Sequence, residues 1–200
     1  MSEILNDIER ERLKRLLAEE CTYQLDDDVM DEFLSRMKLV KLKKGDYVFD
    51  EGEYNPSVYI LKEGILARTH LVDGTEHCIS FALPATLFVA TASYYMGKRS
   101  FYREQACCYS EVLYCTREDY DNLIKTSHRF AQWVYSLAMC QVYYYEMKSA
   151  LIKGAAIDRF KSLAVNRPEI LRNVSNKMVA AYLGISPQYL CQLKKKLYNM

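Results

Sequence analysis

The chain has 200 residues, which is long enough for one ordinary domain or two small ones. Half of the residues are hydrophobic and 26% are charged, a composition typical of globular proteins. No apolar run approaches the ~20 residues that a membrane span needs, and residues 1–20 are too charged for a secretory signal. We therefore expect a cytoplasmic protein with no membrane partner.

Charge is distributed unevenly along the chain, whose net charge is only +1. Residues 153–200 hold nine Lys and Arg but two Asp and Glu, a net +7, which leaves −6 on the other 152 residues. A basic end on an acidic body favours a polyanion-binding module joined to a part that does not bind polyanions. The alternative is a basic tail that is merely solvated.

The seven cysteines form no C-x-x-C pair and are scattered through segments that look like strand or helix. They are Cys21, Cys78, Cys107, Cys108, Cys115, Cys140 and Cys191. Reduced, buried thiols explain this pattern better than a metal or cluster site. We expect no metal and assign no cofactor.

The first two thirds of the chain predict two helices followed by many short strands. Apolar residues recur at helical spacing over 3–19 and again over 27–37. Seven β-rich runs follow, at 39–42, 46–50, 57–62, 65–71, 76–82, 101–107 and 111–116. Asp73-Gly74 is a strong hairpin signal between two of them. Short strands joined by tight turns indicate an antiparallel barrel or roll.

A long helix is expected from His128 to Lys153, where neither Gly nor Pro interrupts the chain. Its apolar positions are spaced alternately four and three apart, a seam typical of a helix that pairs with a copy of itself. These predicted dimer-interface residues are Trp133, Leu137, Cys140, Tyr144, Met147 and Leu151. The alternative is a helix that packs only on its own β-domain. Gly154 marks a hinge, and a helix over 155–165 follows it.

The C-terminal segment predicts a helix-turn-helix. Ser175 is a good N-cap for a helix through Leu183, and Gly184 takes the turn. Ser186 then caps a second helix whose first position is Pro187, where no N–H is needed. Two short helices joined by a three-residue glycine turn form this motif. A helical hairpin with a purely structural role is the alternative.

The second of these helices is expected to enter the major groove of DNA with its N-terminal end. The glutamines and the tyrosine are candidates for reading base edges, and the lysines for contacting phosphates. The predicted DNA-binding residues are Ser186, Gln188, Tyr189, Gln192, Lys194 and Lys195.

From about residue 20 to 198 the chain resembles the Crp/Fnr superfamily of transcriptional regulators, and most closely its short Bacteroides-type members. The resemblance is carried by LKKGDYVFDEGE at 42–53, VYILKEG at 58–64, SEVL at 110–113, the long helix and the helix-turn-helix. It implies an α+β protein with an effector-sensing jelly-roll domain over 1–127, a dimerisation helix and hinge over 128–154, and a DNA-binding domain over 155–200. It also implies a homodimer on double-stranded DNA, an unknown small effector in the roll, and RNA polymerase as a further candidate partner.

The sequence departs from the nucleotide-binding cassette of that family. Residues 85–90 contain neither the Gly nor the Glu that would hold a ribose, so we do not expect cyclic nucleotide binding. Arg99-Ser100 resembles the phosphate-binding pair, and with Phe101 it is the candidate effector pocket, although Arg99 also fits an exposed loop. Only Cys21 lies where the iron–sulfur branch has several cysteines, and haem binding leaves no trace. The β-hairpin wing that often follows the recognition helix is absent, so we expect no DNA contacts from it.

Two other functions compete with this interpretation. A cupin-type enzyme needs a His-x-His cluster, but the histidines are His70, His77 and His128, and none forms that motif. An enzyme is therefore not expected. The second competitor is a β-roll ligand sensor or interaction protein that has lost DNA binding.

Overall fold

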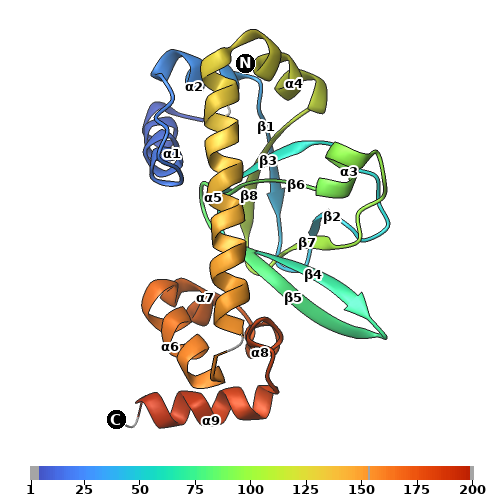
Figure 1. Ribbon diagram of the computed structural model, residues 1–200, viewed down its shortest axis with the longest axis vertical. Helices are drawn as coiled ribbons and strands as arrows, with labels where there is room; N and C mark the ends of the chain where they lie inside the picture. The colour runs from blue at the N-terminus through green and yellow to red at the C-terminus, as the bar shows by residue number, and fades with distance from the viewer. Residues whose placement is uncertain (1–4, 153, 199–200) are drawn as a thin grey trace.

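The computed structural model describes residues 5–152 and 154–198 and is an α+β structure around a β-roll (Figure 1). Two helices come first, α1 (Asp7–Glu19) and α2 (Asp27–Ser35). The side chain of Asn6 accepts a hydrogen bond from the Glu9 backbone N–H, and the Glu9 carboxylate accepts one from the Asn6 N–H. This capping box starts α1 at Asp7, later than the expected position 3.

Within the described residues, eight strands form two antiparallel four-stranded sheets, ordered β1-β8-β3-β6 and β2-β7-β4-β5. The strands are β1 (Lys38–Leu42), β2 (Tyr47–Phe49), β3 (Val58–Glu63), β4 (Leu66–Val72), β5 (Thr75–Ala82), β6 (Leu87–Val89), β7 (Arg103–Ala106) and β8 (Ser110–Cys115). The antiparallel roll is thus confirmed. The β4–β5 hairpin turns at Asp73 and Gly74, whose φ angles of 49° and 75° agree with the Asp-Gly signal. Strand β6 and the short helix α3 (Thr91–Met96) were not expected.

The roll has apolar packing on both faces of its first sheet, as strand β3 illustrates. Tyr59 and Leu61 point into the cluster between the two sheets, whereas Val58 and Ile60 point into the cluster under the helices. Successive side chains of a strand face opposite sides, so two buried faces make a continuously apolar strand. This is why β3 has no polar alternation.

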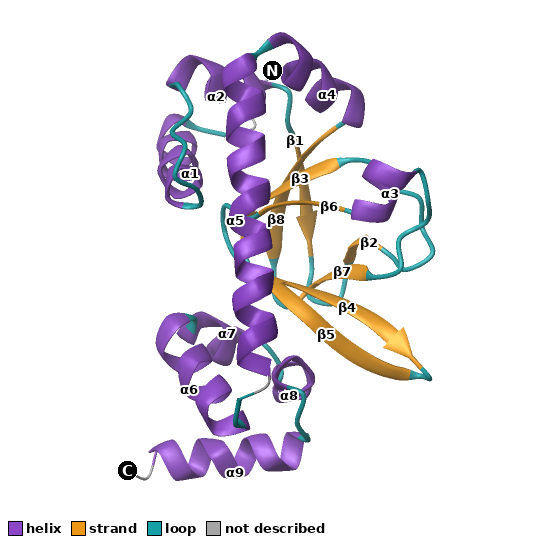
Figure 2. Cartoon of the chain, viewed as in Figure 1, coloured by secondary structure: helices purple, strands orange, loops and turns teal. Residues whose placement is uncertain are grey.

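Six helices follow the roll in the described part of the chain (Figure 2). They are α4 (Arg117–Thr126), α5 (His128–Ile152), α6 (Ala156–Asn166), α7 (Pro168–Asn173), α8 (Asn176–Leu183) and α9 (Pro187–Tyr198). Helix α6 ends at Asn166, close to the expected end at 165, and Pro168 occupies the first turn of α7, a helix that was not expected. Proline is tolerated there because that N–H has no partner within the helix.

Helix α5 runs from the N-terminal helices past the roll to the C-terminal helices (Figure 1). Its first half packs into the cluster beneath α1, α2 and α4. The C-terminal helices share a second cluster with the roll, in which Ile65 and Cys78 meet Leu163 and Val179. We call residues 155–198 the head. The shared cluster shows that the head packs against the roll. Among the described residues, no helix is both long and apolar enough to span a membrane.

Candidate functional site

Helices α8 and α9 are joined by a tight turn whose caps are those expected from the sequence. The Ser175 hydroxyl accepts a hydrogen bond from the Met178 N–H at 3.3 Å, and the Ser186 hydroxyl accepts one from the Tyr189 N–H at 3.1 Å. Gly184 ends α8 in the left-handed region with φ 65°. That backbone conformation disfavours any residue with a Cβ. Local chemistry therefore determines where both helices begin and where α8 ends.

The two helices are held together by a wedge of buried apolar side chains. Each of its members is at most 4% exposed: Val179, Ala180, Leu183, Leu190 and Leu193. The small side chain of Ala180 lets α8 and α9 approach each other, and the Ala180 carbonyl accepts a hydrogen bond from Ile185 N–H at 3.0 Å. The opposite, outer face of α9 is consequently not needed for packing against α8.

That outer face carries the predicted DNA-binding residues. Those that the structure leaves exposed are Ser186, Gln188, Tyr189, Gln192 and Lys195. Lys194 is half-buried, and its ammonium donates to the Asn176 side-chain oxygen at 2.6 Å, which ties α9 to the start of α8. Helix α9 lies across the end of the molecule opposite the N-terminal helices (Figure 1). A polar and basic helix face is thus presented outward.

The three residues predicted for an effector pocket do not converge on one point. The Arg99 guanidinium donates to the Gly52 carbonyl at 2.7 Å in an exposed position. The buried Ser100 hydroxyl donates to the Tyr102 carbonyl at 2.6 Å, and the Phe101 ring is 61% exposed. Each polar group is bonded to nearby backbone, so the exposed-loop alternative describes Arg99 better.

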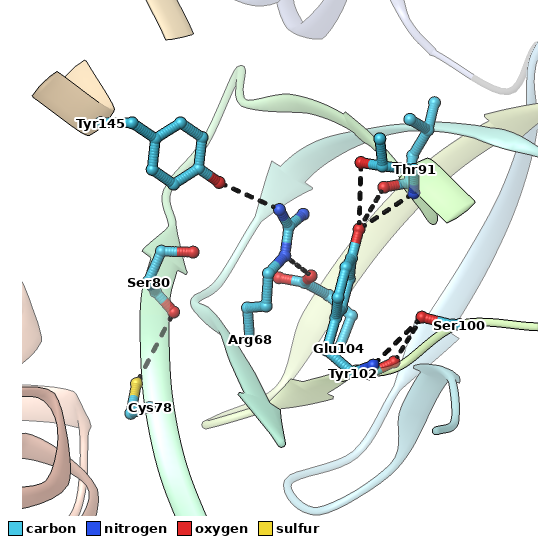
Figure 3. Close-up of polar contacts among 9 residues, drawn as sticks. Arg68, Cys78, Ser80, Thr91, Ser100, Tyr102, Glu104 and Tyr145 are labelled. Atoms are coloured by element: carbon cyan, nitrogen blue, oxygen red, sulfur yellow. Dashed lines mark hydrogen bonds and ion pairs between the residues drawn. The ribbon is translucent and has the colours of Figure 1, made fainter. Parts of the chain in front are cut away.

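An ion pair that was not expected from the sequence lies inside the roll. Arg68 in β4 and Glu104 in β7 are direct cross-strand neighbours, and the Arg68 Nε lies 2.8 Å from a Glu104 carboxylate oxygen (Figure 3). Their side chains are only 13% and 1% exposed. Burial raises the pKa of Glu104, and the adjacent guanidinium offsets part of that rise. Burial opposes the charge of Arg68, but Glu104 and the neighbouring tyrosines outweigh it and raise the pKa of the guanidinium.

Other groups hold this pair in place. The Arg68 guanidinium stacks on the Tyr102 ring, 4.5 Å from its centroid, and donates from Nη1 to the Tyr145 hydroxyl of α5 at 3.2 Å. The Tyr102 hydroxyl in turn donates to the Val89 carbonyl at 2.8 Å. Opposite charges in two β-rich runs were visible in the sequence, but only the strand register shows that they face each other.

The predicted dimer seam divides into two parts. Trp133 and Leu137 are 1% and 7% exposed in the single chain, where they pack in the core with Phe33 and Phe130. They have almost no surface left to bury in a partner, so their assignment to the interface is corrected to the core. Cys140 is half-buried against the same cluster.

The remaining seam residues lie lower on α5, where the helix is exposed. Tyr144 and Met147 are 51% and 45% exposed, while the side chain of Leu151 lies outside the described residues. Several further apolar residues are exposed on this helix: Tyr135, Met139, Val142 and Tyr143. A shallow, open depression of about 570 Å³ also lies on this part of α5, lined by Val142, Tyr145, Glu146, Ser149 and Ala150.

The described cysteines are all free thiols. Burial raises the pKa of Cys107 and of Cys115 to about 12, so both are protonated at neutral pH. In residues 5–152 and 154–198 no three His, Cys, Asp or Glu side chains gather as metal ligands would. Cys21, Cys78, Cys107 and Cys115 are thus buried core thiols as expected, whereas Cys108 and Cys140 are half-buried and Cys191 is exposed.

Comparisons with known proteins agree with this architecture. Residues 39–127 match the cyclic nucleotide-binding domain family. No curated protein matches the sequence. Among solved structures, FixK2 from Bradyrhizobium japonicum has a TM-score of 0.69 at 17% identity, covering 82% of this chain and 85% of its own.

Two more regulators give similar values. The c-di-GMP responsive global regulator CLP of Xanthomonas campestris has a TM-score of 0.70 at 15% identity, over 87% of this chain and 92% of its own. The catabolite activator protein of Thermus thermophilus has a TM-score of 0.56 at 19% identity, over 88% and 84%. Residues 39–127 are therefore similar to cyclic nucleotide-binding domains, and the chain as a whole shares its fold with these regulators.

Proposed function

We propose that this protein is a transcriptional regulator that binds double-stranded DNA in a sequence-specific manner through α8 and α9. The observation that carries the proposal is the outer face of α9, where Gln188, Gln192 and Lys195 stand exposed on a helix whose other face is locked into the head. Such a helix fits the major groove, in which glutamine can pair with adenine in a bidentate manner. The protein then acts as a regulator and not as an enzyme.

The proposal includes a homodimer formed through the lower half of α5. Tyr135, Met139, Val142 and Met147 expose apolar surface along one long helix, and exposed contiguous apolar surface marks interaction sites. Pairing with α5 of a second copy would bury it and place two heads side by side. Two recognition helices about 34 Å apart would then contact a near-palindromic site.

We further propose that a small effector binds at the roll and that this effector is not a cyclic nucleotide. Residues 85–90 offer no carboxylate for a ribose, and the arginine inside the roll, Arg68, is already paired with Glu104. We expect cyclic AMP and cyclic GMP to bind weakly or not at all in calorimetry. Micromolar affinity that is lost in Arg99→Ala would overturn this part of the proposal.

The test of DNA binding is a binding-site selection with the wild type, Gln188→Ala and Lys195→Ala. Loss of a base-reading glutamine should cost about 1–3 kcal/mol and relax the preference at one base pair per half-site. Loss of a phosphate-contacting lysine should weaken binding to all sequences and flatten the salt dependence.

The two variants are matched controls for each other because both residues are exposed on α9. If Gln188→Ala keeps the wild-type base preference while Lys195→Ala changes it, the roles are reversed. If the wild type selects no sequence and binds no duplex at low salt, the DNA-binding proposal is wrong. The protein would then be a ligand sensor or interaction protein on the same fold.

A further inference from the structure

One turn of α5 contacts both the interior of the roll and the head. Tyr145 and Lys148 are three positions apart, so they lie on the same face of the helix. The Tyr145 hydroxyl accepts a hydrogen bond from Arg68 Nη1 at 3.2 Å (Figure 3). The Lys148 ammonium lies 4.4 Å from the centroid of the Tyr182 ring in α8. A short rigid segment thus joins two parts of the molecule.

On the roll side, Arg68 has little freedom to move. The Glu104 carboxylate holds its Nε, and the Tyr102 ring lies under its guanidinium. The Tyr102 hydroxyl is itself fixed, since it donates to the Val89 carbonyl and accepts from the Thr91 N–H at 3.1 Å. These contacts connect strand β6, strand β7 and the start of α3 to Arg68, and Arg68 to Tyr145.

On the head side, Lys148 sits at the contact between α8 and strand β5. The Tyr182 ring is 5.0 Å from the Phe81 ring of β5, so α8 packs directly on the roll beside the lysine. Burial is the main cause that lowers the pKa of Lys148, with Arg68 adding to the effect. A cation that is partly removed from water gains more from an aromatic face than an exposed one. The Lys148–Tyr182 contact is therefore part of how the head is held.

We propose that Tyr145 and Lys148 form a latch that couples the Arg68–Glu104 pair inside the roll to the docking of α8 on β5. The two side chains share one turn of an uninterrupted helix, so no flexible segment separates their movements. Breaking the Arg68–Tyr145 hydrogen bond loosens Lys148 and with it the packing of Tyr182 on Phe81. The consequence for DNA, a change in how α9 is presented, rests on the proposed function, whereas the latch itself does not.

The experiment compares amide hydrogen exchange in the full chain between the wild type, Tyr145→Phe and Tyr143→Phe. Tyr145→Phe removes only the hydroxyl that Arg68 contacts, and Tyr143→Phe makes the same change at an exposed neighbour. Loss of a hydrogen bond to a charged group at a half-exposed site changes the local opening equilibrium by about 5-fold. We expect α8 amides to exchange about 5-fold faster in Tyr145→Phe and at the wild-type rate in Tyr143→Phe. Unchanged exchange in α8 of Tyr145→Phe would overturn the latch.

A double-mutant cycle with Lys148→Met makes the test sharper. Methionine keeps an apolar stem but removes the cation from the Tyr182 ring. If the two residues act as one device, the double variant exchanges no faster in α8 than the faster single variant. If the rate increases of the two single variants instead multiply in the double variant, the two residues are independent anchors, and the latch is overturned. Binding to a mixed-sequence duplex is measured in parallel, and a wild type that binds no DNA refutes the proposed function while hydrogen exchange still decides the latch.

Discussion

Replacing Glu104 by glutamine tests how much the ion pair inside the roll matters for stability. The substitution keeps the shape of the side chain but removes the charge that lies 2.8 Å from Arg68 Nε. Breaking a buried pair costs about 3–5 kcal/mol, because the remaining charge has lost its compensation. Glutamine retains an acceptor oxygen and Arg68 is 13% exposed, so we expect a loss of about 3 kcal/mol, at the lower end of that range.

Replacing both partners by apolar residues should have a different effect. Arg68→Met combined with Glu104→Leu removes both charges and keeps a packed side chain at each position. Apolar replacement of a whole buried pair is often neutral or stabilising, so the double variant should lie within about 1 kcal/mol of the wild type. Arg68→Met alone leaves a buried carboxylate and should again cost about 3 kcal/mol.

Urea unfolding followed by tryptophan fluorescence measures these changes. Trp133 is the only tryptophan of the chain, and it lies in the core under the helices, away from the substituted pair. It therefore reports unfolding without being a neighbour of the change. A loss below about 0.5 kcal/mol in Glu104→Gln, or a double variant as unstable as the two single losses combined, would refute the reasoning.

Three further predictions concern other parts of the chain. The hydrogen bond from Lys62, with smaller help from Tyr109 and Lys41, lowers the pKa of Glu111 to about 2, below the 4.5 of a free side chain. The Glu111 carboxylate thus stabilises the fold above pH 4.5 and loses that effect as the pH falls towards 2. Glu111→Gln should lower the free energy of unfolding by about 1–2 kcal/mol at neutral pH and by progressively less as the pH falls. The exposed control Glu19→Gln should show no such pH dependence, and an equal loss for Glu111→Gln at neutral and at acid pH would contradict this prediction. In Gly64→Ala, the new Cβ would lie 2.2 Å from the Ser110 hydroxyl at a φ of +97°, so thermal unfolding should show a loss of about 3 kcal/mol. Gly74→Ala, with open space at φ +75°, should lose only about 1 kcal/mol, and an equal loss would rule out the clash. The double change Met139→Glu with Val142→Glu should give a monomer by light scattering, whereas Ile8→Glu, at an exposed position of α1, should leave the dimer intact. A dimer that survives the double change would place the interface elsewhere.

Several features of this protein follow from the sequence alone because their causes are local. The caps Ser175 and Ser186, the left-handed Gly184 and the Asp73-Gly74 turn each depend on a few consecutive residues. The helical and alternating apolar patterns likewise act over short distances, which is why α5 and the antiparallel roll could be predicted. The residues that define the turn between α8 and α9 could therefore be identified from the sequence, without the tertiary structure.

Only the tertiary structure decided which apolar and charged residues meet. A two-per-heptad seam looks the same whether it faces a partner or its own chain, and the position of α1 and α2 decided that Trp133 and Leu137 belong to the core. The Arg68–Glu104 pair depends on strand register, and the contact between the Tyr182 and Phe81 rings depends on how the head meets the roll. These contacts join residues far apart in the chain, and no local pattern specifies their partners, because the packing of the whole molecule selects them.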